Sequence, residues 1–256
     1  MLKNADIKDL KELEKFLSDG IISLRILSYI KAYGFERYFL KFWYSYDENG
    51  INAVISLFEN SVLVKTNIKA DFSELCAFLS MLSFETLSCE ADTAYLLGFE
   101  KYTTKQGYVY SGESSDFTSK SIDETRLKAV YNLISERIPD SFNDSKEAYF
   151  SFLSDFTFRA RRNLARGKCI YENDILAACA VTSAETEDKA LLSGVATSED
   201  FKGGGYGKKV VLSLVNELQK FGKSAYVIAL NDSAQGFYEH VGFEKDSLIA
   251  YINRKD

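Results

Sequence analysis

The sequence is poor in the residues that most metal and hydrolase sites require. It has one histidine and no C-x-x-C pair among its four cysteines, so a zinc site with nitrogen and sulfur ligands is not expected. A Ser-His-Asp hydrolase would depend on His240 alone, and there is no G-x-S-x-G motif. The cysteines lie in apolar or strand-like runs, which predicts buried free thiols in a reducing compartment. They are Cys76, Cys89, Cys169 and Cys179.

Long apolar runs are also lacking, as is an excess of basic residues. No stretch of about 18 or more apolar residues occurs, so no membrane span is expected. The first residues, MLKNADIKDLKELEKFL, are charged throughout and lack the apolar core of a signal peptide. The 31 basic and 37 acidic residues give a net charge of −6, which argues against a nucleic-acid partner. We therefore expect a cytoplasmic protein that binds neither nucleic acid nor membrane.

The sequence is instead rich in core-forming residues and in glycine relative to proline. The 256 residues are 46% hydrophobic and 14% aromatic, enough for one large domain or two small ones. There are 15 glycines but only one proline, Pro139. Apolar runs separated by turn residues over 37–67 predict a three-stranded meander, which a helix, a short strand and a second helix follow.

The polar segment 111–121, SGESSDFTSKS, is the best candidate for a domain boundary. The elements predicted after it are helices over about 123–137 and 146–163, strands over 167–172, 175–184 and 190–197, a helix opened by glycines, a strand over 225–230, a short helix over about 233–240 and a last strand. The tetrapeptide Gly-Phe-Glu-Lys ends the short helix of each half, at 98–101 and at 242–245. We therefore predict two related halves, 1–115 and 116–256.

A glycine cluster at 203–207 joins a predicted strand to a predicted helix. Glycine allows close approach to the backbone, and the first N–H groups of a helix have no intrahelical partner, so a phosphate is the natural occupant. A Walker A loop is excluded because it would need glycine at position 202 and Ser or Thr at position 209, and both are lysine. The G-x-G-x-x-G pattern fails as well, because Lys208 stands at its third glycine.

A third phosphate-binding pattern fits the cluster. Thr197–Lys208, TSEDFKGGGYGK, resembles motif A of the GNAT superfamily of N-acyltransferases, and Asn231–Phe243 resembles its motif B. The resemblance implies an α+β fold of three layers, with a mixed, mostly antiparallel sheet and helices on both faces, present in tandem. The matching segment of the first half, NIKADFSE, has no glycine. The first half therefore resembles a degenerate copy, which we expect to bind no coenzyme A.

The resemblance implies that acetyl-CoA is the cosubstrate, without a metal, and that a primary amine of a small molecule or an amino group is the acceptor. Backbone amides of the glycine loop would hold the pyrophosphate, and the strand before it would pair with the pantetheine arm. The residues implied to contact acetyl-CoA are Val195, Thr197, Lys202, Gly203, Gly205, Tyr206, Gly207, Lys208, Asn231 and Ser233. Asn231 would equally suit a helix N-cap.

Tyr238 matches the family tyrosine that can protonate the leaving thiolate, although a core position would also suit it. No general base is identifiable. Glu185, Glu187 and Asp188 would lie on the amine side in this fold, but they also fit a solvated turn. We read His240 as a surface residue. Two alternatives stay open: a non-catalytic acyl-CoA-binding regulatory module, and a first half that serves as a partner-binding or dimerisation domain, which would give a homodimer.

Overall fold

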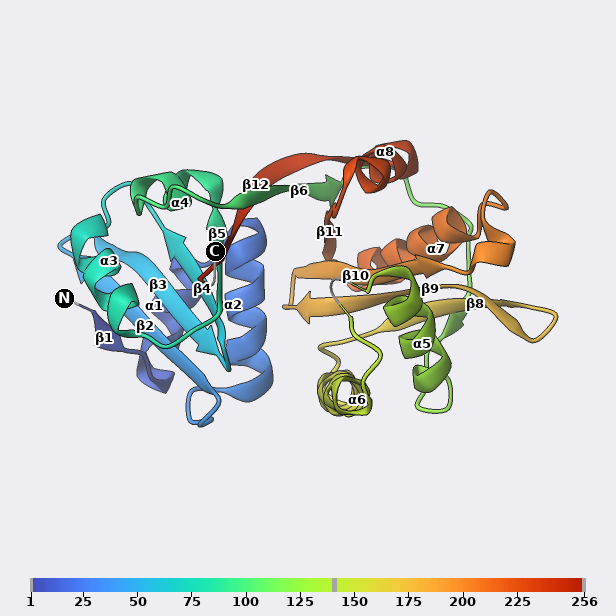
Figure 1. Cartoon of the computed structure of the whole chain (residues 1–256), viewed down its shortest axis with the longest axis horizontal. Coiled ribbons are helices and arrows are strands. Elements are labelled where there is room, and N and C mark those ends of the chain that lie inside the picture. The colour runs from blue at the N-terminus through green and yellow to red at the C-terminus, as the bar shows by residue number, and fades with distance from the viewer. Residues whose placement is uncertain (1, 140–141, 255–256) are drawn as a thin grey trace. The chain divides into compact units, whose positions relative to one another are not determined.

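The computed structural model describes residues 2–139 and 142–254 and forms two compact units (Figure 1). The first unit contains the chain up to Gly107, the segment Ala229–Gln235 and the residues from Lys245 on. The second contains Tyr108–Ile228 and Gly236–Glu244. These units are defined by packing. The predicted division at 115/116 concerns instead which residues form each of the two related halves, and it stays a prediction.

The first unit is built on strands in the order β1-β2-β3-β4-β5-β12. All of these neighbours are antiparallel except β4 and β5, which run parallel. The elements are β1 (Lys3–Asn4), α1 (Leu10–Phe16), α2 (Gly20–Tyr33), β2 (Leu40–Asp47), β3 (Gly50–Phe58), β4 (Ser61–Thr66), α3 (Phe72–Met81), β5 (Thr86–Glu90), α4 (Ala91–Leu96), the start of β6 (Thr103–Tyr110) and most of β12 (Phe243–Asn253).

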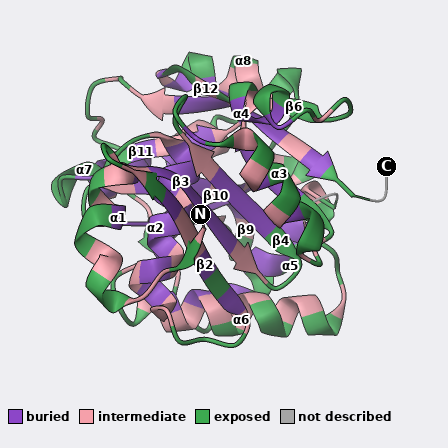
Figure 2. Ribbon diagram, turned by 90° about the vertical axis from the view of Figure 1, so that its left-hand side faces the viewer, coloured by how far each residue is buried: buried purple, intermediate pink, exposed green. Residues whose placement is uncertain are grey.

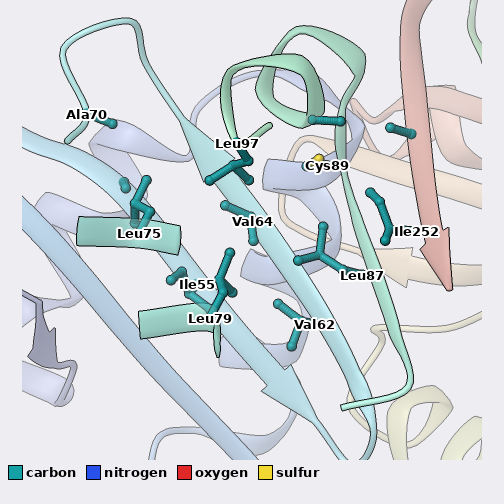
Figure 3. Close-up of a cluster of buried hydrophobic side chains, with 13 residues drawn as sticks. Ile55, Val62, Val64, Ala70, Leu75, Leu79, Leu87, Cys89, Leu97 and Ile252 are labelled. Atoms are coloured by element: carbon teal, nitrogen blue, oxygen red, sulfur yellow. The ribbon is translucent and has the colours of Figure 1, made fainter. Parts of the chain in front are cut away.

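A hydrophobic cluster joins the strands of this unit to α3 and α4. Leu75 and Leu79 of α3 and Leu97 after α4 pack against side chains from β3, β4 and β5, such as Val64 and Leu87 (Figure 3). Helix α2 contacts β4 and β5 as well and is buried along most of its length. In Figure 2 the middle of β3 is buried, whereas much of α3 is exposed. Burial of this apolar surface is the main stabilising contribution to the unit.

The second unit orders its strands β11-β10-β9-β8-β7, with the end of β6 next to β11. Strands β10 and β11 are parallel, and the neighbours from β10 to β7 are antiparallel. In Figure 1, α5 and α6 cover one face of these strands and α7 the other. The elements are β7 (Lys120–Ser121), α5 (Leu127–Arg137), α6 (Lys146–Ala160), β8 (Gly167–Glu172), β9 (Ile175–Glu185), β10 (Lys189–Thr197), α7 (Tyr206–Lys220), β11 (Ser224–Ile228) and most of α8 (Asp232–Val241).

The two halves of the chain repeat one order of elements: a short strand, two helices, a three-stranded meander, a helix, a strand parallel to the last of the meander, a short helix and a final strand. Unrelated topologies would have overturned the duplication hypothesis, and the shared order supports it. The predicted mixed, mostly antiparallel sheet with helices on both faces is confirmed.

The polar segment at 111–121 is held in place by α7. Asn216 accepts a hydrogen bond from the Ser115 amide at 3.0 Å and donates to the carbonyls of Ser115 and Phe117. Ser119 adds a hydroxyl contact of 2.8 Å to Ser213. The segment is therefore an ordered strap over one helix. None of the helices in the described part of the chain is long and apolar enough to cross a bilayer.

All four cysteines are free thiols, and three of them are buried. The expectation of burial is wrong for Cys76, which is exposed, because it lies on the outer side of α3 and its thiol donates to the Leu97 carbonyl. Burial raises the pKa of Cys89 and of Cys179 to about 12 in each case. Neither of these buried thiols is a nucleophile near neutral pH.

Candidate active site

Strand β10 is paired with β11 along only its first half. The parallel register runs from Lys189↔Ser224 to Leu192↔Val227, and among the described residues it stops there. On its other side β10 stays paired with β9 as far as Thr197, across a bulge between Ser193 and Ala196. The backbone groups of residues 193–197 that face away from β9 are therefore available to an extended ligand, as an added strand would use them.

The glycine loop lies directly after this free strand edge. Gly203 and Gly205 have φ of 76° and 75°, a conformation that other residues adopt only with strain. Gly205 is the N-cap of α7, and a Cβ at either glycine would meet none of the other described residues within 4 Å. The first amides of a 15-residue helix thus open onto free space, with the positive end of the helix dipole behind them. This arrangement fits a pyrophosphate.

Gly207 has a packing role as well. A Cβ there would lie 3.0 Å from Oγ1 of Thr197 and 3.6 Å from the ring of Phe237. The absence of a side chain therefore lets the first turn of α7 approach both the end of β10 and helix α8. Two predicted site residues, Thr197 and Gly207, are brought together by this contact, and Phe237 is the neighbour of Tyr238 in the sequence.

Three charged side chains near the loop, Lys202, Glu199 and Arg137, form ion pairs. Lys202 lies 2.8 Å from Glu199, which also binds Arg137, and both cations lower the pKa of Glu199, Lys202 more than Arg137. The hydroxyl of Tyr206 donates to Glu172 at 3.2 Å. Lys208, in the first turn of α7, is half-buried. A phosphate at the loop would compete with Glu199 for Lys202.

Tyr238 is buried, with 7% of its surface exposed. Its ring packs against Phe237, Phe243 and Tyr108, with centroid distances of 5.2, 5.5 and 6.4 Å. Within the described residues its hydroxyl makes no hydrogen bond, and burial raises its pKa well above 10. The phenol is therefore neutral at physiological pH and can serve as a proton donor.

Asn231 and Ser233 stand at the start of α8. The Asn231 side chain accepts a hydrogen bond of 2.9 Å from the Ala234 amide, which confirms the N-cap. Both residues lie in the segment that packs with the first unit, so their contact with the cosubstrate stays a prediction. His240, near the end of the helix, is exposed, as expected of a surface residue.

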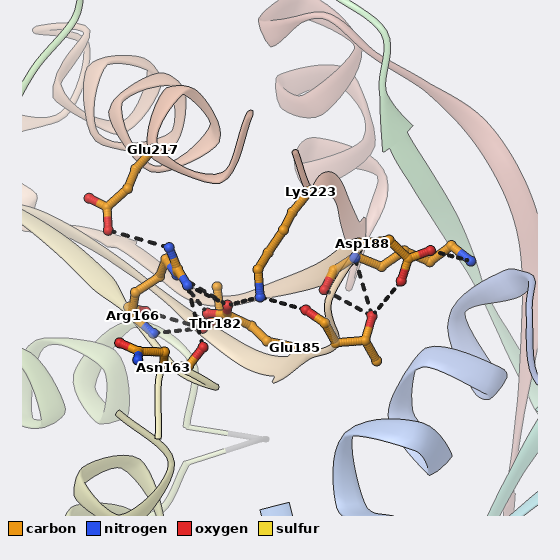
Figure 4. A network of polar contacts seen from close by, with 9 residues as sticks. Asn163, Arg166, Thr182, Glu185, Asp188, Glu217 and Lys223 are labelled. Carbon is orange, nitrogen blue, oxygen red and sulfur yellow. Dashed lines mark hydrogen bonds and ion pairs between the residues drawn. The ribbon is translucent and has the colours of Figure 1, made fainter. Parts of the chain in front are cut away.

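A buried charge network, which the sequence analysis missed, lies at the opposite end of β10 (Figure 4). Glu185 is completely buried and accepts hydrogen bonds from Thr182 at 2.7 Å, Arg166 at 3.1 Å and Lys223 at 2.9 Å. Arg166 also lies 3.8 Å from Glu217 of α7. The cations come from the residues just before β8 and β11, far from Glu185 in sequence, so no local pattern reveals them.

The network changes which residues can act as a general base. The reading of Glu185 as part of a solvated turn is wrong, because two cations and a hydroxyl occupy its carboxylate. It is therefore unsuited to accept a proton from a substrate amine. Asp188 is exposed, as a solvated turn residue would be; burial acts to raise its pKa, but hydrogen bonds from Thr186 and the charge of Lys189 outweigh this and lower it. A lowered pKa makes Asp188 a weak base.

Comparisons with known proteins agree with this arrangement. The model of the acetyltransferase (GNAT) family matches residues 127–243, which include β10, the glycine loop and Tyr238. No curated protein matches the chain in sequence.

Several solved structures share the fold over nearly the whole chain. A GNAT-family acetyltransferase from Colwellia psychrerythraea is 13% identical with a TM-score of 0.65, and the alignment covers 99% of this chain and 100% of that one. A tandem GNAT protein of the clavulanic acid biosynthesis pathway is 11% identical with a TM-score of 0.62, at 99% and 98% coverage. A GCN5-related N-acetyltransferase-like protein from Streptococcus suis is 14% identical with a TM-score of 0.57, at 98% and 100% coverage.

At these identities the structural likeness concerns the fold, and it extends the tandem GNAT architecture to both halves. The family match concerns the second half, where the free edge of β10 leads into the open glycine loop. Taken together, these findings identify residues 127–243 as a GNAT acetyltransferase-family domain within a chain that has the tandem GNAT fold.

Proposed function

We propose that the protein is an acetyl-CoA-dependent N-acetyltransferase that acts on the primary amine of a small molecule or on an amino group. The observation that carries this proposal is the end of the β10–β11 pairing after Leu192, directly before an open glycine-led helix N-terminus. A strand edge and a helix N-terminus in succession suit an extended thiol arm that ends in a pyrophosphate.

In this proposal the backbone of Val195 and Thr197 pairs with the pantetheine arm. The amides from Gly203 to Lys208 hold the pyrophosphate, and Lys202 and Lys208 add positive charge. Gly205 leaves the space that the phosphates occupy, since a Cβ there would lie more than 4 Å from every described residue beyond its chain neighbours and helix. Tyr206, Asn231 and Ser233 complete the predicted contacts.

Bound acetyl-CoA supplies the thioester that the acceptor amine attacks. When the acetyl group moves from sulfur to nitrogen, the thiolate gains a proton and the amine loses one. Tyr238 donates its phenolic proton to the thiolate, and burial keeps this group protonated until that moment. The phenolate then recovers a proton from solvent. The proton of the amine passes to solvent, and Glu185 is not the group that accepts it, because Arg166 and Lys223 occupy its carboxylate.

The corresponding region of the first unit is closed, which supports a single cosubstrate site. Lys65 of β4 lies 2.9 Å from Glu90 of β5, and the hydroxyls of Thr66 and Thr93 are 2.8 Å apart. At the start of α3 the Asp71 carboxylate accepts a hydrogen bond from the Glu74 amide, the place that a phosphate would take. Side chains therefore bridge the strands, and a negative charge caps the helix.

The test is release of coenzyme A from acetyl-CoA in the presence of a panel of amines, with binding of acetyl-CoA measured separately by calorimetry. We expect binding with a stoichiometry of one per chain and release that depends on the amine. Binding without release under any amine would favour the alternative, a regulatory acyl-CoA-binding module. Absence of binding would overturn both.

A further inference from the structure

We infer that Ile134 of α5 sets the length of the acyl chain and restricts the protein to acetyl or similarly short groups. The inference rests on the proposed function and adds the chemical class of the acyl donor. It concerns the side of β10 that is covered by α5, where Gly194 lies in the strand bulge.

The bulge marks where the acyl group must end. A thiol arm that pairs with β10 can follow only its free edge, which begins after Leu192. The thioester therefore lies beside residues 193–195. The acyl carbons beyond it face the side chains that line the bulge. At this point the chain has a glycine, so the backbone presents no side chain of its own.

Ile134 is the side chain nearest to the place that a Cβ at position 194 would take. A Cβ built there would lie 2.6 Å from Cδ1 of Ile134, a distance at which one of the two must shift, and 3.1 Å from Cγ2 of Val181, which is a tight contact. Ile134 has 0% and Val181 2% of its surface exposed. The space behind Gly194 is thus already filled by the end of one isoleucine.

The other neighbours of the bulge hold it in place. The Cys179 thiol donates to the Gly194 carbonyl at 3.7 Å, and Cys179 is completely buried in the same hydrophobic cluster as Ile134. Adding methylenes to so tightly packed a site is unfavourable. A butyryl chain has two carbons more than acetyl, and these would need the volume that Ile134 occupies.

The experiment compares dissociation constants for acetyl-, butyryl- and octanoyl-CoA in the full chain and in the variant Ile134→Ala, which removes three side-chain carbons. We expect the parent protein to bind butyryl-CoA about tenfold or more weakly than acetyl-CoA. We expect Ile134→Ala to shift the ratio of the two constants toward butyryl-CoA by about tenfold. The same ratio is read from kcat/KM with the best amine found.

The matched control is Leu127→Ala, a similar truncation in the same helix and cluster, two turns away from the bulge. It should lower stability by a similar amount and leave the ratio unchanged. If Ile134→Ala does not fold, Ile134→Val is measured against Leu127→Ala in the same way. The inference would be overturned, and the proposed function kept, by equal affinity of the parent for all three acyl-CoAs. The same holds if the ratio of the butyryl- and acetyl-CoA dissociation constants is equal in the two variants. Failure of the parent to bind any acyl-CoA would overturn the proposed function.

Discussion

The ammonium of Lys223 lies 2.9 Å from a carboxylate oxygen of Glu185, and both side chains are shielded from solvent. With Arg166 on the same carboxylate, the contact ties the starts of β8 and β11 to the end of β9. Each ion in such a group depends on its partners, because none can return to water without unfolding.

Replacing Glu185 by Gln should therefore lower the free energy of unfolding by about 3–5 kcal/mol, because the buried Lys223 and the partly buried Arg166 lose the carboxylate that they share. Urea denaturation followed by circular dichroism measures the change. The matched control is Glu124→Gln, which breaks an exposed pair with Arg161 and should cost far less. Similar losses in both variants would contradict the assigned burial.

The substitution Gly205→Glu should abolish acetyl-CoA binding, since it places a negative charge in the open space at the start of α7. Gly205→Ala is the control, because it carries the same backbone strain at positive φ without the charge and should weaken binding only modestly. Calorimetry gives both affinities. Unchanged circular dichroism establishes that the fold is kept. Normal binding by Gly205→Glu would refute the assignment of the glycine loop as the pyrophosphate site.

Tyr238→Phe should lower kcat by about 10²- to 10⁴-fold while leaving the affinity for acetyl-CoA nearly unchanged, because only a proton donor is lost. The measurement is steady-state kinetics together with calorimetry. A loss of affinity equal to the loss of kcat would mean instead that the hydroxyl serves binding.

The raised pKa of Tyr238 has a consequence for pH. The folded protein holds this proton more tightly than the unfolded chain, so the stabilising contribution is complete below the ordinary value of 10 and is lost as pH rises above it. We expect no decline of kcat from this group up to pH 10. A decline near pH 8 that Tyr238→Phe removes would contradict the assignment.

The thiols should react unequally with iodoacetamide. Cys76 is exposed, whereas Cys89, Cys169 and Cys179 are buried and burial raises the pKa of each. Mass spectrometry of the native protein should find modification at Cys76 first, and all four thiols should react in urea. Modification of Cys179 at the rate of Cys76 would show that the core around the bulge opens readily.

Much of the second half could be predicted because its elements carry local signals. The predicted strand at 167–172 coincides with β8, and the apolar periodicity after the glycines marks α7. Gly203 and Gly205 were informative because positive φ and free space at a helix start depend on the residues themselves.

What could not be predicted depends on partners distant in sequence. Glu185 looks like a turn residue until Arg166 and Lys223 are brought to it by two other strands. The strap at 111–121 reads as a linker because its partner, Asn216, is distant in the chain. Gly194 shows no motif, and its φ of 53° and the close approach of Ile134 become visible only in the structure.

The pairing of β12 with β5 affects how the chain acquires its structure. Ile249 lies opposite Glu90 and Asn253 opposite Thr86, so the sheet of the first unit is completed by nearly the last residues described. A growing chain can form α2, α3 and the β2–β4 meander early, but β5 keeps an open edge until residue 253 has left the ribosome. An unpaired edge is a template for association with other chains. Chaperone dependence during synthesis should therefore fall on the half of the protein that is made first.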